Sequence, residues 1–247
     1  MFSSLMFRRL FHGCFVCLAF AYGQVHGDTI PGLHGTGVAN NGSLLVEGSV
    51  DQHYTLLSSP SGSGYGANCF IVSCTAWLAN GPSSQWIGPQ SPIEALCPVG
   101  TYDYRTTFNL TGYDAATAVI NGSWITDNIG EEILINGVDT GSYHPDEQFT
   151  TASPFTITSG FVPGLNTLDF IVCNAAGGSS TSNPTALRVE MSGTATPEPS
   201  TLVLLGIGAI SLLAYAWRRT IGSAVDCGTR STFSTGKTGS FHSPSFQ

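Results

Sequence analysis

Apolar and polar positions alternate in short runs between residues 28 and 200. Gly, Pro, Asn, Asp or Ser interrupts the chain about every ten residues, and the runs between are rich in Val, Ile, Thr, Phe and Tyr. Short runs of this composition with regular turn signals are typical of β-sandwiches and barrels. The pattern predicts strands at residues 43–47, 53–57, 67–72, 101–110, 116–124, 132–135, 153–158, 167–173 and 185–192.

Strict period-two alternation marks two of these predicted strands. Because successive side chains of a strand point to opposite faces, each run should place one set on a single face: Tyr102, Tyr104, Thr106 and Phe108 in the first, and Leu168, Phe170 and Val172 in the second. The dipeptides Asn121-Gly122 and Asn136-Gly137 predict tight turns, since both residue types tolerate positive φ. No amphipathic helical pattern precedes residue 201, so the domain is predicted to be all-β.

The N-terminus has the three parts of a secretory signal peptide. Arg8 and Arg9 supply a positive n-region, residues 10–22 supply an apolar h-region, and Val25-His26-Gly27 offers a cleavage sequence before Asp28. We therefore predict a signal peptide at residues 1–27 and export of the rest of the chain. The alternative is an uncleaved N-terminal anchor, but the apolar run is short for a span of about 20 residues.

A second uncharged apolar run lies at residues 201–217. Its 17 residues would form a helix about 26 Å long, near the short limit for crossing a bilayer. Arg218 and Arg219 follow at once, and arginine favours the cytoplasmic side of a membrane. The run predicts one C-terminal transmembrane helix with the preceding domain outside. Residues 220–247 are rich in Ser, Thr and Gly, which predicts a disordered cytoplasmic tail.

Pro197-Glu198-Pro199, the apolar run and the Arg218-Arg219 pair stand in an order that resembles the PEP-CTERM sorting signal of exported bacterial proteins. The resemblance covers residues 196–219. It implies processing by an exosortase-type protease, and a protein that is membrane-anchored or released to the cell surface or extracellular matrix, in a setting of exopolysaccharide. Family members usually end soon after the basic cluster, so the 28-residue tail departs from the pattern. The alternative is a Pro-containing linker before an ordinary anchor.

The exported part is strongly acidic. Residues 28–200 contain fifteen Asp and Glu against two basic residues, Arg105 and Arg188, which gives a net charge of −13. Such a domain repels nucleic acid and anionic lipid, which excludes functions that depend on binding nucleic acid. Neutral partners, cationic partners and partners bridged by a divalent cation stay open.

Four of the seven cysteines fall in the exported part: Cys69, Cys74, Cys97 and Cys173. In an oxidising compartment four thiols can form two disulfides in three ways. One pairing joins Cys69 to Cys74 and Cys97 to Cys173, and the sequence does not choose among the three. No histidine lies near Cys69 or Cys74, which argues against a zinc site.

Residues 47–195 resemble the galactose-binding-domain-like jelly rolls of secreted bacterial proteins. The resemblance is carried by segments 108–110, 124–128, 135–137, 164–168 and 187–190. It implies a jelly-roll-type β-sandwich that forms an ectodomain of residues 28–195. Domains of this type often bind sugars, and others only space or dock other parts.

Three tryptophans are candidate carbohydrate-binding residues: Trp77, Trp86 and Trp124. Each could offer a flat apolar face to a sugar ring, with Asn and Asp nearby to bind hydroxyl groups. The alternative is that each ring fills the core. This alternative is strongest for Trp124, because Gly, Ser, Asn and Pro surround Trp77 and Trp86.

A second candidate site is a set of oxygen ligands for a structural calcium ion: Asp127, Asn128, Glu131 and Asp139. Asp146 and Glu147 follow in the next acidic loop. Calcium binds six to eight oxygens from such loops, although the spacing of an EF-hand is absent. The alternative is a solvated acidic rim. No other cofactor is predicted.

Catalytic motifs are not evident in the sequence. Gly62-Ser63-Gly64-Tyr65-Gly66 has no recognisable His and Asp partners, and adjacent Glu131 and Glu132 would point to opposite faces of a strand. We therefore expect a non-catalytic exported surface protein with a structural or adhesive role toward extracellular polysaccharide. The alternatives are a dedicated carbohydrate-binding module and, third, a secreted glycan hydrolase.

Overall fold

The computed structural model describes residues 27–93, 96–176, 183–198 and 201–228 of the chain, with side chains of the last segment described for 204–219. The chain divides into two compact units, Met1–Pro197 and Glu198–Gln247, and each is described by itself. The predicted signal peptide lies outside the described residues except for Gly27.

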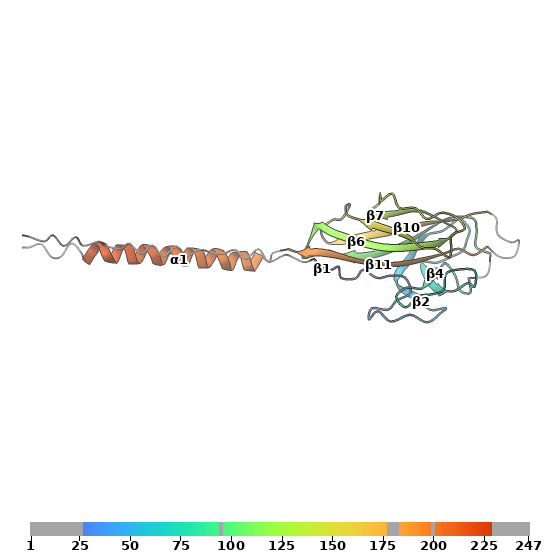
Figure 1. The fold of residues 1–247 in the computed structure, drawn as a ribbon, viewed down its shortest axis with the longest axis horizontal. Coiled ribbons are helices and arrows are strands. Elements are labelled where there is room, and N and C mark those ends of the chain that lie inside the picture. The colour runs from blue at the N-terminus through green and yellow to red at the C-terminus, as the bar shows by residue number, and fades with distance from the viewer. Residues whose placement is uncertain (1–26, 94–95, 177–182, 199–200, 229–247) are drawn as a thin grey trace, which may run out of the picture. The chain divides into compact units, whose positions relative to one another are not determined.

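In the described part of the ectodomain, the regular secondary structure consists of β-strands joined by loops (Figure 1). Eight of the nine predicted strands are present within a few residues of their expected bounds. The observed strands are β1 (Asp28–Thr29), β2 (Val50–Ser58), β3 (Asn68–Val72), β4 (Trp86–Gly88), β5 (Gly100–Asn109), β6 (Tyr113–Asp127), β7 (Ile129–Ile135), β8 (Val138–Asp139), β9 (Ser153–Ile157), β10 (Leu165–Asn174) and β11 (Ala186–Pro197).

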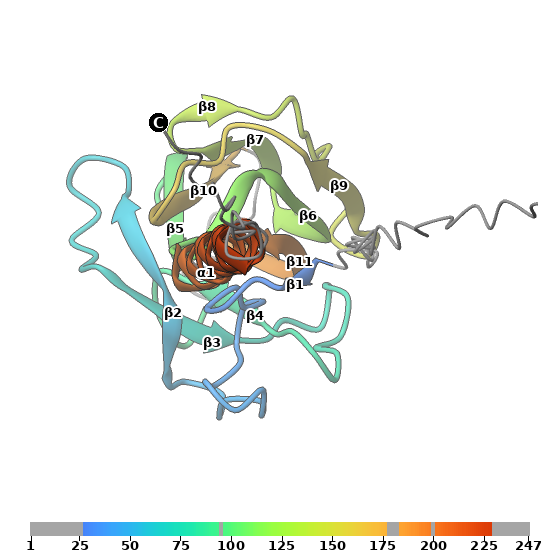
Figure 2. The same cartoon turned by 90° about the vertical axis from the view of Figure 1, so that its left-hand side faces the viewer.

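All strands join one antiparallel sheet in the order β8-β7-β10-β5-β2-β3-β4-β11-β6-β9, with β1 beside β11. The sheet curls (Figure 2). From β4 onward the chain passes repeatedly between the half that contains β10 and the half that contains β11. The all-β class is therefore confirmed, while the finer jelly-roll assignment stays a prediction.

An aromatic cluster joins the two halves of the sheet. The ring of Phe170 on β10 lies 5.9 Å from that of Trp124 on β6, 6.2 Å from that of Phe155 on β9 and 6.2 Å from that of Tyr54 on β2. These rings are buried within one continuous apolar core. The period-two prediction is confirmed, since both predicted sets of side chains are at most 2% exposed.

Two local predictions are wrong, the strand at residues 43–47 and the turn at Asn121-Gly122, and one turn is confirmed. Residues 43–47 form no strand, and only a single bridge joins Val38 to Leu44. Asn136-Gly137 is a turn with positive φ at both residues. Asn121-Gly122, in contrast, lies inside β6, where a side chain at position 122 would collide with the ring of Phe155.

The predicted disulfides do not form. Cys69, Cys74 and Cys173 are free thiols, which leaves no pair in any of the three connectivities. Strand alternation explains the failure of one pairing: Asn174 donates a hydrogen bond to the carbonyl oxygen of Cys97 at 3.0 Å, so the adjacent Cys173 side chain points to the opposite face of β10.

The C-terminal unit contains one helix, α1 (Thr201–Gly228). It includes the whole predicted span 201–217 and continues to Gly228, so residues 220–228 are helical where the sequence predicted a disordered tail; residues 229–247 lie outside the described residues. The extension contains no proline and ends at glycine, a common helix terminator.

In the part of the chain that the structure describes, no helix meets the length and apolarity required to cross a membrane.

Candidate functional site

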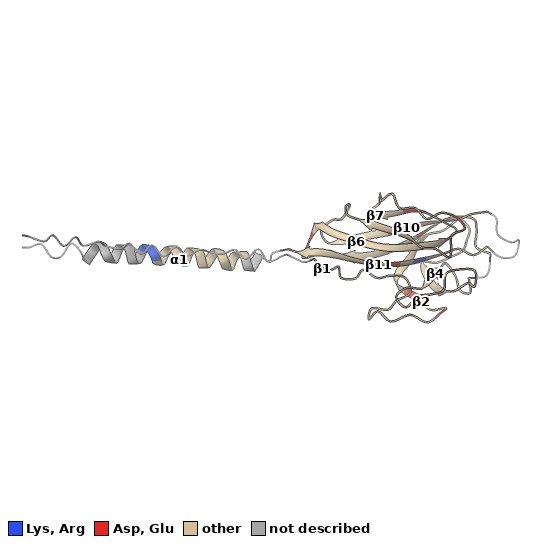
Figure 3. Ribbon diagram, in the orientation of Figure 1, with Lys and Arg blue, Asp and Glu red and all other residues tan. Residues whose placement is uncertain are grey.

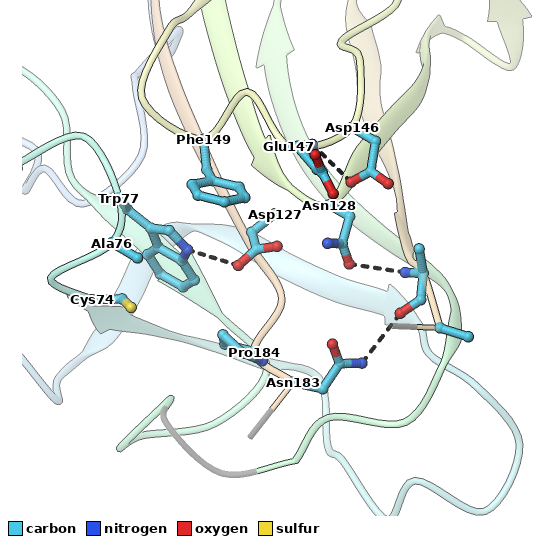
Figure 4. Close-up of a pocket in the computed structure, with 12 residues that line it drawn as sticks. Cys74, Ala76, Trp77, Asp127, Asn128, Asp146, Glu147, Phe149, Asn183 and Pro184 are labelled. Carbon is cyan, nitrogen blue, oxygen red and sulfur yellow. Dashed lines mark hydrogen bonds between the residues drawn. The ribbon is translucent and has the colours of Figure 1, made fainter. Parts of the chain in front are cut away.

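A pocket of about 510 Å³ lies at one edge of the ectodomain, where β6 and β10 end and β7 and β11 begin. Antiparallel pairing brings these strand ends together, and the loop after β3 and the β8–β9 connection complete the walls (Figure 4). The residues that line the pocket are Cys74, Ala76, Trp77, Asp127, Asn128, Asp146, Glu147, Phe149, Ala175, Ala176, Asn183 and Pro184.

Asp127, the last residue of β6, is the most buried carboxylate of the pocket, at 6% exposure. Its Oδ2 accepts a hydrogen bond of 2.7 Å from the indole Nε1 of Trp77. Its main-chain carbonyl accepts a hydrogen bond of 2.6 Å from the hydroxyl of Thr185. The carboxylate and the backbone of Asp127 are thus each held by one hydrogen bond, and the carboxylate lies between Trp77 and Asn128 in Figure 4.

Burial has a strong electrostatic effect on this carboxylate. Burial is the largest cause that raises the pKa of Asp127, the Trp77 hydrogen bond lowers it, and the nearby Asp146 carboxylate raises it; the net result is a pKa of about 6. A carboxyl group with this pKa loses its proton in mildly acidic solution, whereas an ordinary Asp carboxyl loses it at about pH 4. Figure 3 shows how acidic residues outnumber basic ones in the ectodomain.

Amide side chains form the side of the pocket next to β10. The Oδ1 atom of Asn128 accepts a hydrogen bond of 2.9 Å from the backbone N–H of Ala175. The Nδ2 atom of Asn183 donates to the carbonyl oxygen of Ala175 at 3.3 Å. Both amides are therefore oriented by the same stretch of backbone.

The outer wall is the segment that carries Asp146, Glu147 and Phe149. Paired backbone hydrogen bonds between His144 and Gly130, of 2.8 and 2.9 Å, hold its start against β7. The carbonyl oxygen of Phe149 accepts from the N–H of Leu78 at 2.8 Å, which fastens its end to the Trp77 loop. Asp146 and Glu147 are exposed, whereas the Phe149 ring is partly buried against the core.

The tryptophan prediction is correct for the location of one residue and wrong for the exposure of all three. Trp77, Trp86 and Trp124 are 5%, 1% and 1% exposed. Trp77 packs on Trp86 with ring centroids 4.6 Å apart, and Trp124 packs on Phe170. Trp77 still lines the pocket, but Trp86 and Trp124 are core residues and offer no face to a ligand.

The four predicted calcium ligands are not brought together. Asp127 and Asn128 line the pocket, while Glu131 is an exposed residue of β7 and the Asp139 carboxylate accepts from the N–H of Gly141 in a different loop. Among the described residues, no group of three or more His, Cys, Asp and Glu side chains is arranged to hold a metal ion. The predicted ligands fall on different elements: Asp127 and Asn128 precede β7, Glu131 lies within β7, and Asp139 lies on β8 beyond the turn at residues 136–137.

The residues of the predicted sorting signal lie outside this pocket. Pro197 is the last residue of β11, so the ectodomain continues two residues beyond its predicted end, and Glu198 follows it. Pro199 lies outside the described residues. Arg218 and Arg219 are on α1, where the guanidinium carbon of Arg219 lies 5.4 Å from the centre of the Tyr215 ring.

Phe149 and Asn183 were missed by the sequence analysis. Each stands in a loop of polar and small residues with no periodic pattern around it. Their position beside strand ends is the one available signal, since loops at the same edge of a sheet meet in space.

Comparison with known proteins identifies the C-terminal segment. Residues 195–219 match the PEP-CTERM protein-sorting motif, so the chain carries the signal of an exported, sorted protein that is processed by exosortase-type machinery. A search of curated proteins gave no match.

Among solved structures, an exo-beta-1,3-galactanase from Phanerochaete chrysosporium, determined with beta-1,3-galactotriose, is similar over 64% of this chain, at 16% identity and a TM-score of 0.21. The similarity covers 29% of the galactanase chain.

Proposed function

We propose that this chain is a non-catalytic surface protein that binds extracellular polysaccharide in the pocket around Asp127. The observation that carries the proposal is the combination of an aromatic ring, carboxylates and amides in one pocket of about 510 Å³. Pockets of some hundreds of Å³ with a few fixed polar groups are typical of small-ligand sites.

Sugar rings present an apolar face and a rim of hydroxyl groups, and the pocket offers a counterpart to each. The Phe149 ring is accessible and apolar, so it could pack on a sugar face. Asn128, Asn183 and the carboxylates supply donors and acceptors for hydroxyl groups. Trp77, at 5% exposure, acts as support for Asp127 rather than as a stacking platform.

Membrane attachment is the second part of the proposal. The match at residues 195–219 supports sorting to the membrane or cell surface. We propose that the apolar run 201–217, which lies within α1, is the membrane-embedded part of the signal, and that Arg218 and Arg219 mark its cytoplasmic end. The ectodomain would then be held at the surface until the signal is processed.

Binding of the purified full-length protein to a panel of insoluble and soluble polysaccharides tests the first part. Phe149→Ala should weaken binding about fivefold, because a ring–sugar contact contributes about 1 kcal/mol. Tyr143→Ala is the matched control, since Tyr143 is 57% exposed and does not line the pocket. Equal retention of a folded Phe149→Ala variant would contradict binding at this pocket.

Deletion of residues 197–219 tests the anchor. The variant should appear in the medium, whereas the complete chain stays cell-bound or is released with a C-terminus near Pro197–Pro199. Mass mapping of the C-terminal peptide separates these forms. A deletion variant that stays cell-bound would contradict anchoring by this segment.

A glycan hydrolase is the second candidate function, and one observation favours it. Hydrolases pair a carboxylic acid of raised pKa with a second carboxylate, and the pKa of Asp127 is raised to about 6 with Asp146 nearby. Release of reducing sugar by the wild-type protein, abolished in Asp127→Asn, would establish this function and overturn the non-catalytic proposal.

A further inference from the structure

We propose that the pocket around Asp127 selects amino sugars, whose protonated amine pairs with the Asp127 carboxylate while ring hydroxyls contact Asn128 and Asn183. This inference rests on the proposed function, because it names the class of sugar that the same pocket would bind. Its observations are the charge balance of the pocket, the open oxygen of Asp127 and the chemistry of the surrounding walls.

The pocket has negative charge without a matching cation. Asp127, Asp146 and Glu147 all line it, and no Lys or Arg is among the lining residues that the structure describes. Arg105 pairs with Asp169 elsewhere in the described ectodomain, so it does not compensate the charge of the pocket. A buried carboxylate without a cation is costly, so a cationic ligand would gain affinity by supplying one.

One oxygen of Asp127 is directed to the pocket. Oδ2 accepts from Trp77, whereas Oδ1 has no hydrogen bond within the described residues and is not enclosed by protein. The side chain as a whole is only 6% exposed. It therefore presents a single, fixed acceptor at the inner end of the pocket, where an ammonium group would form a short, charge-assisted hydrogen bond.

The remaining walls favour a sugar over a simple alkylammonium chain. A lysine side chain would need one carboxylate and a narrow apolar channel. This pocket instead carries two amides, whose backbone contacts fix their orientation, and the exposed carboxylates of Asp146 and Glu147 near its mouth. Those carboxylates repel uronic acids and other anionic sugars, which narrows the ligand to a cationic or neutral sugar.

Isothermal titration of the purified full-length protein at neutral pH tests the inference. The probes are β-1,4-linked tetramers of glucosamine, N-acetylglucosamine and glucose, with tetralysine as the peptide comparison. The glucosamine tetramer should bind at least about tenfold more tightly than the other two sugars, because only it supplies a charge-assisted hydrogen bond to Asp127.

Variants assign the preference to Asp127. Asp127→Asn keeps an acceptor for Trp77 and should abolish the preference for glucosamine, and Asp146→Asn, at an exposed position, should weaken it without a folding defect. Glu132→Gln is the matched control, since it removes the same charge at an exposed position on β7 that does not line the pocket. Thermal melting of each variant verifies folding.

The alternative outcomes separate this inference from the function on which it rests. Equal binding of the three sugars would overturn selection of amino sugars and leave polysaccharide binding intact. Binding of no sugar would overturn both. Tetralysine binding as tightly as glucosamine, with loss in Asp127→Asn, would replace the sugar by a basic peptide. Binding that disappears in EDTA would replace the ammonium group by a metal ion.

Discussion

Asp127 and Asp169 are both buried aspartates of the same domain, yet their surroundings differ. Asp169 on β10 is 2% exposed, and its two oxygens accept hydrogen bonds of 2.5 and 2.8 Å from the guanidinium group of Arg105 on the neighbouring strand β5. Asp127 is 6% exposed, has one indole donor and forms no ion pair with any described residue. One carboxylate is compensated within the sheet, and the other opens into a pocket.

The difference separates structural charge from charge that is available to a ligand. The bidentate pair of Arg105 and Asp169 links two strands, and neither residue lines the pocket around Asp127. The Asp127 carboxylate has a raised pKa because burial is not balanced by a cation. In a domain with only two basic residues, placing one of them at Asp169 leaves the pocket negative.

The largest expected effect on stability comes from removing the Arg105 cation that pairs with Asp169. Arg105→Met would leave Asp169 buried without its partner and should lower the free energy of unfolding by about 3 kcal/mol, near the low end for buried pairs because part of the Arg105 side chain is exposed. Urea denaturation of the full-length protein measures the loss. The double variant with Asp169→Asn should recover part of it. A loss under about 1 kcal/mol would mean that the pair behaves as an ordinary surface salt bridge.

A smaller effect on stability, of opposite sign, is expected at Asp127. Because the pKa of Asp127 is raised from 3.8 to about 6, the folded state holds this proton more tightly than the unfolded state. Its contribution to stability is therefore complete below about pH 4 and is lost as the pH rises through about 6.

Asp127→Asn removes this titration. The variant should match the wild type at pH 4 and exceed it by an amount on the order of 2 kcal/mol at pH 7. Denaturation at both pH values measures the difference. Burial also raises the pKa of Asp103 to about 6, so part of the pH dependence should persist in the variant. An unchanged pH profile would show that Asp127 carries no burial cost.

The smallest effect concerns the one donor that Asp127 has. Trp77→Phe keeps an aromatic ring beside Trp86 but removes the indole N–H. In the wild type, the hydrogen bond from this N–H lowers the pKa of Asp127. The pKa should rise above about 6, and the stability should fall by about 1 kcal/mol at neutral pH. Fluorescence-monitored denaturation gives the stability. A pKa that stays the same would remove Trp77 from the account of this carboxylate.

The sequence predicted the strands well because their information is local. Tyr102, Tyr104 and Phe108 alternate with polar residues, and alternation alone determines which side of a strand is buried. Strand β4 was missed because Trp86–Gly88 is too short to show a period. Residues 43–47 also contain apolar side chains, three of them consecutive, but Leu44 and Val46 find no partner surface and remain 45% and 77% exposed.

The candidate site was only partly predictable, because it is formed by segments distant in sequence. Asp127 and Asn128 stood out as oxygen-rich residues at a strand end, but the sequence paired them with Glu131 and Asp139 rather than with Phe149 and Asn183. Strand order decides that choice, and no local pattern encodes it. Whether Trp77 is exposed likewise depends on Trp86, which packs against it from nine residues away.

The decisive measurement is the pKa of the Asp127 carboxyl group, determined by carbon NMR with and without the glucosamine tetramer. We expect a pKa of about 6 in the free protein, because burial without a cation raises it. We expect this pKa to fall clearly when the ligand is bound, because an adjacent ammonium group stabilises the charged form. A pKa that does not change at saturating ligand would contradict the claim that this carboxylate is left open for a cation.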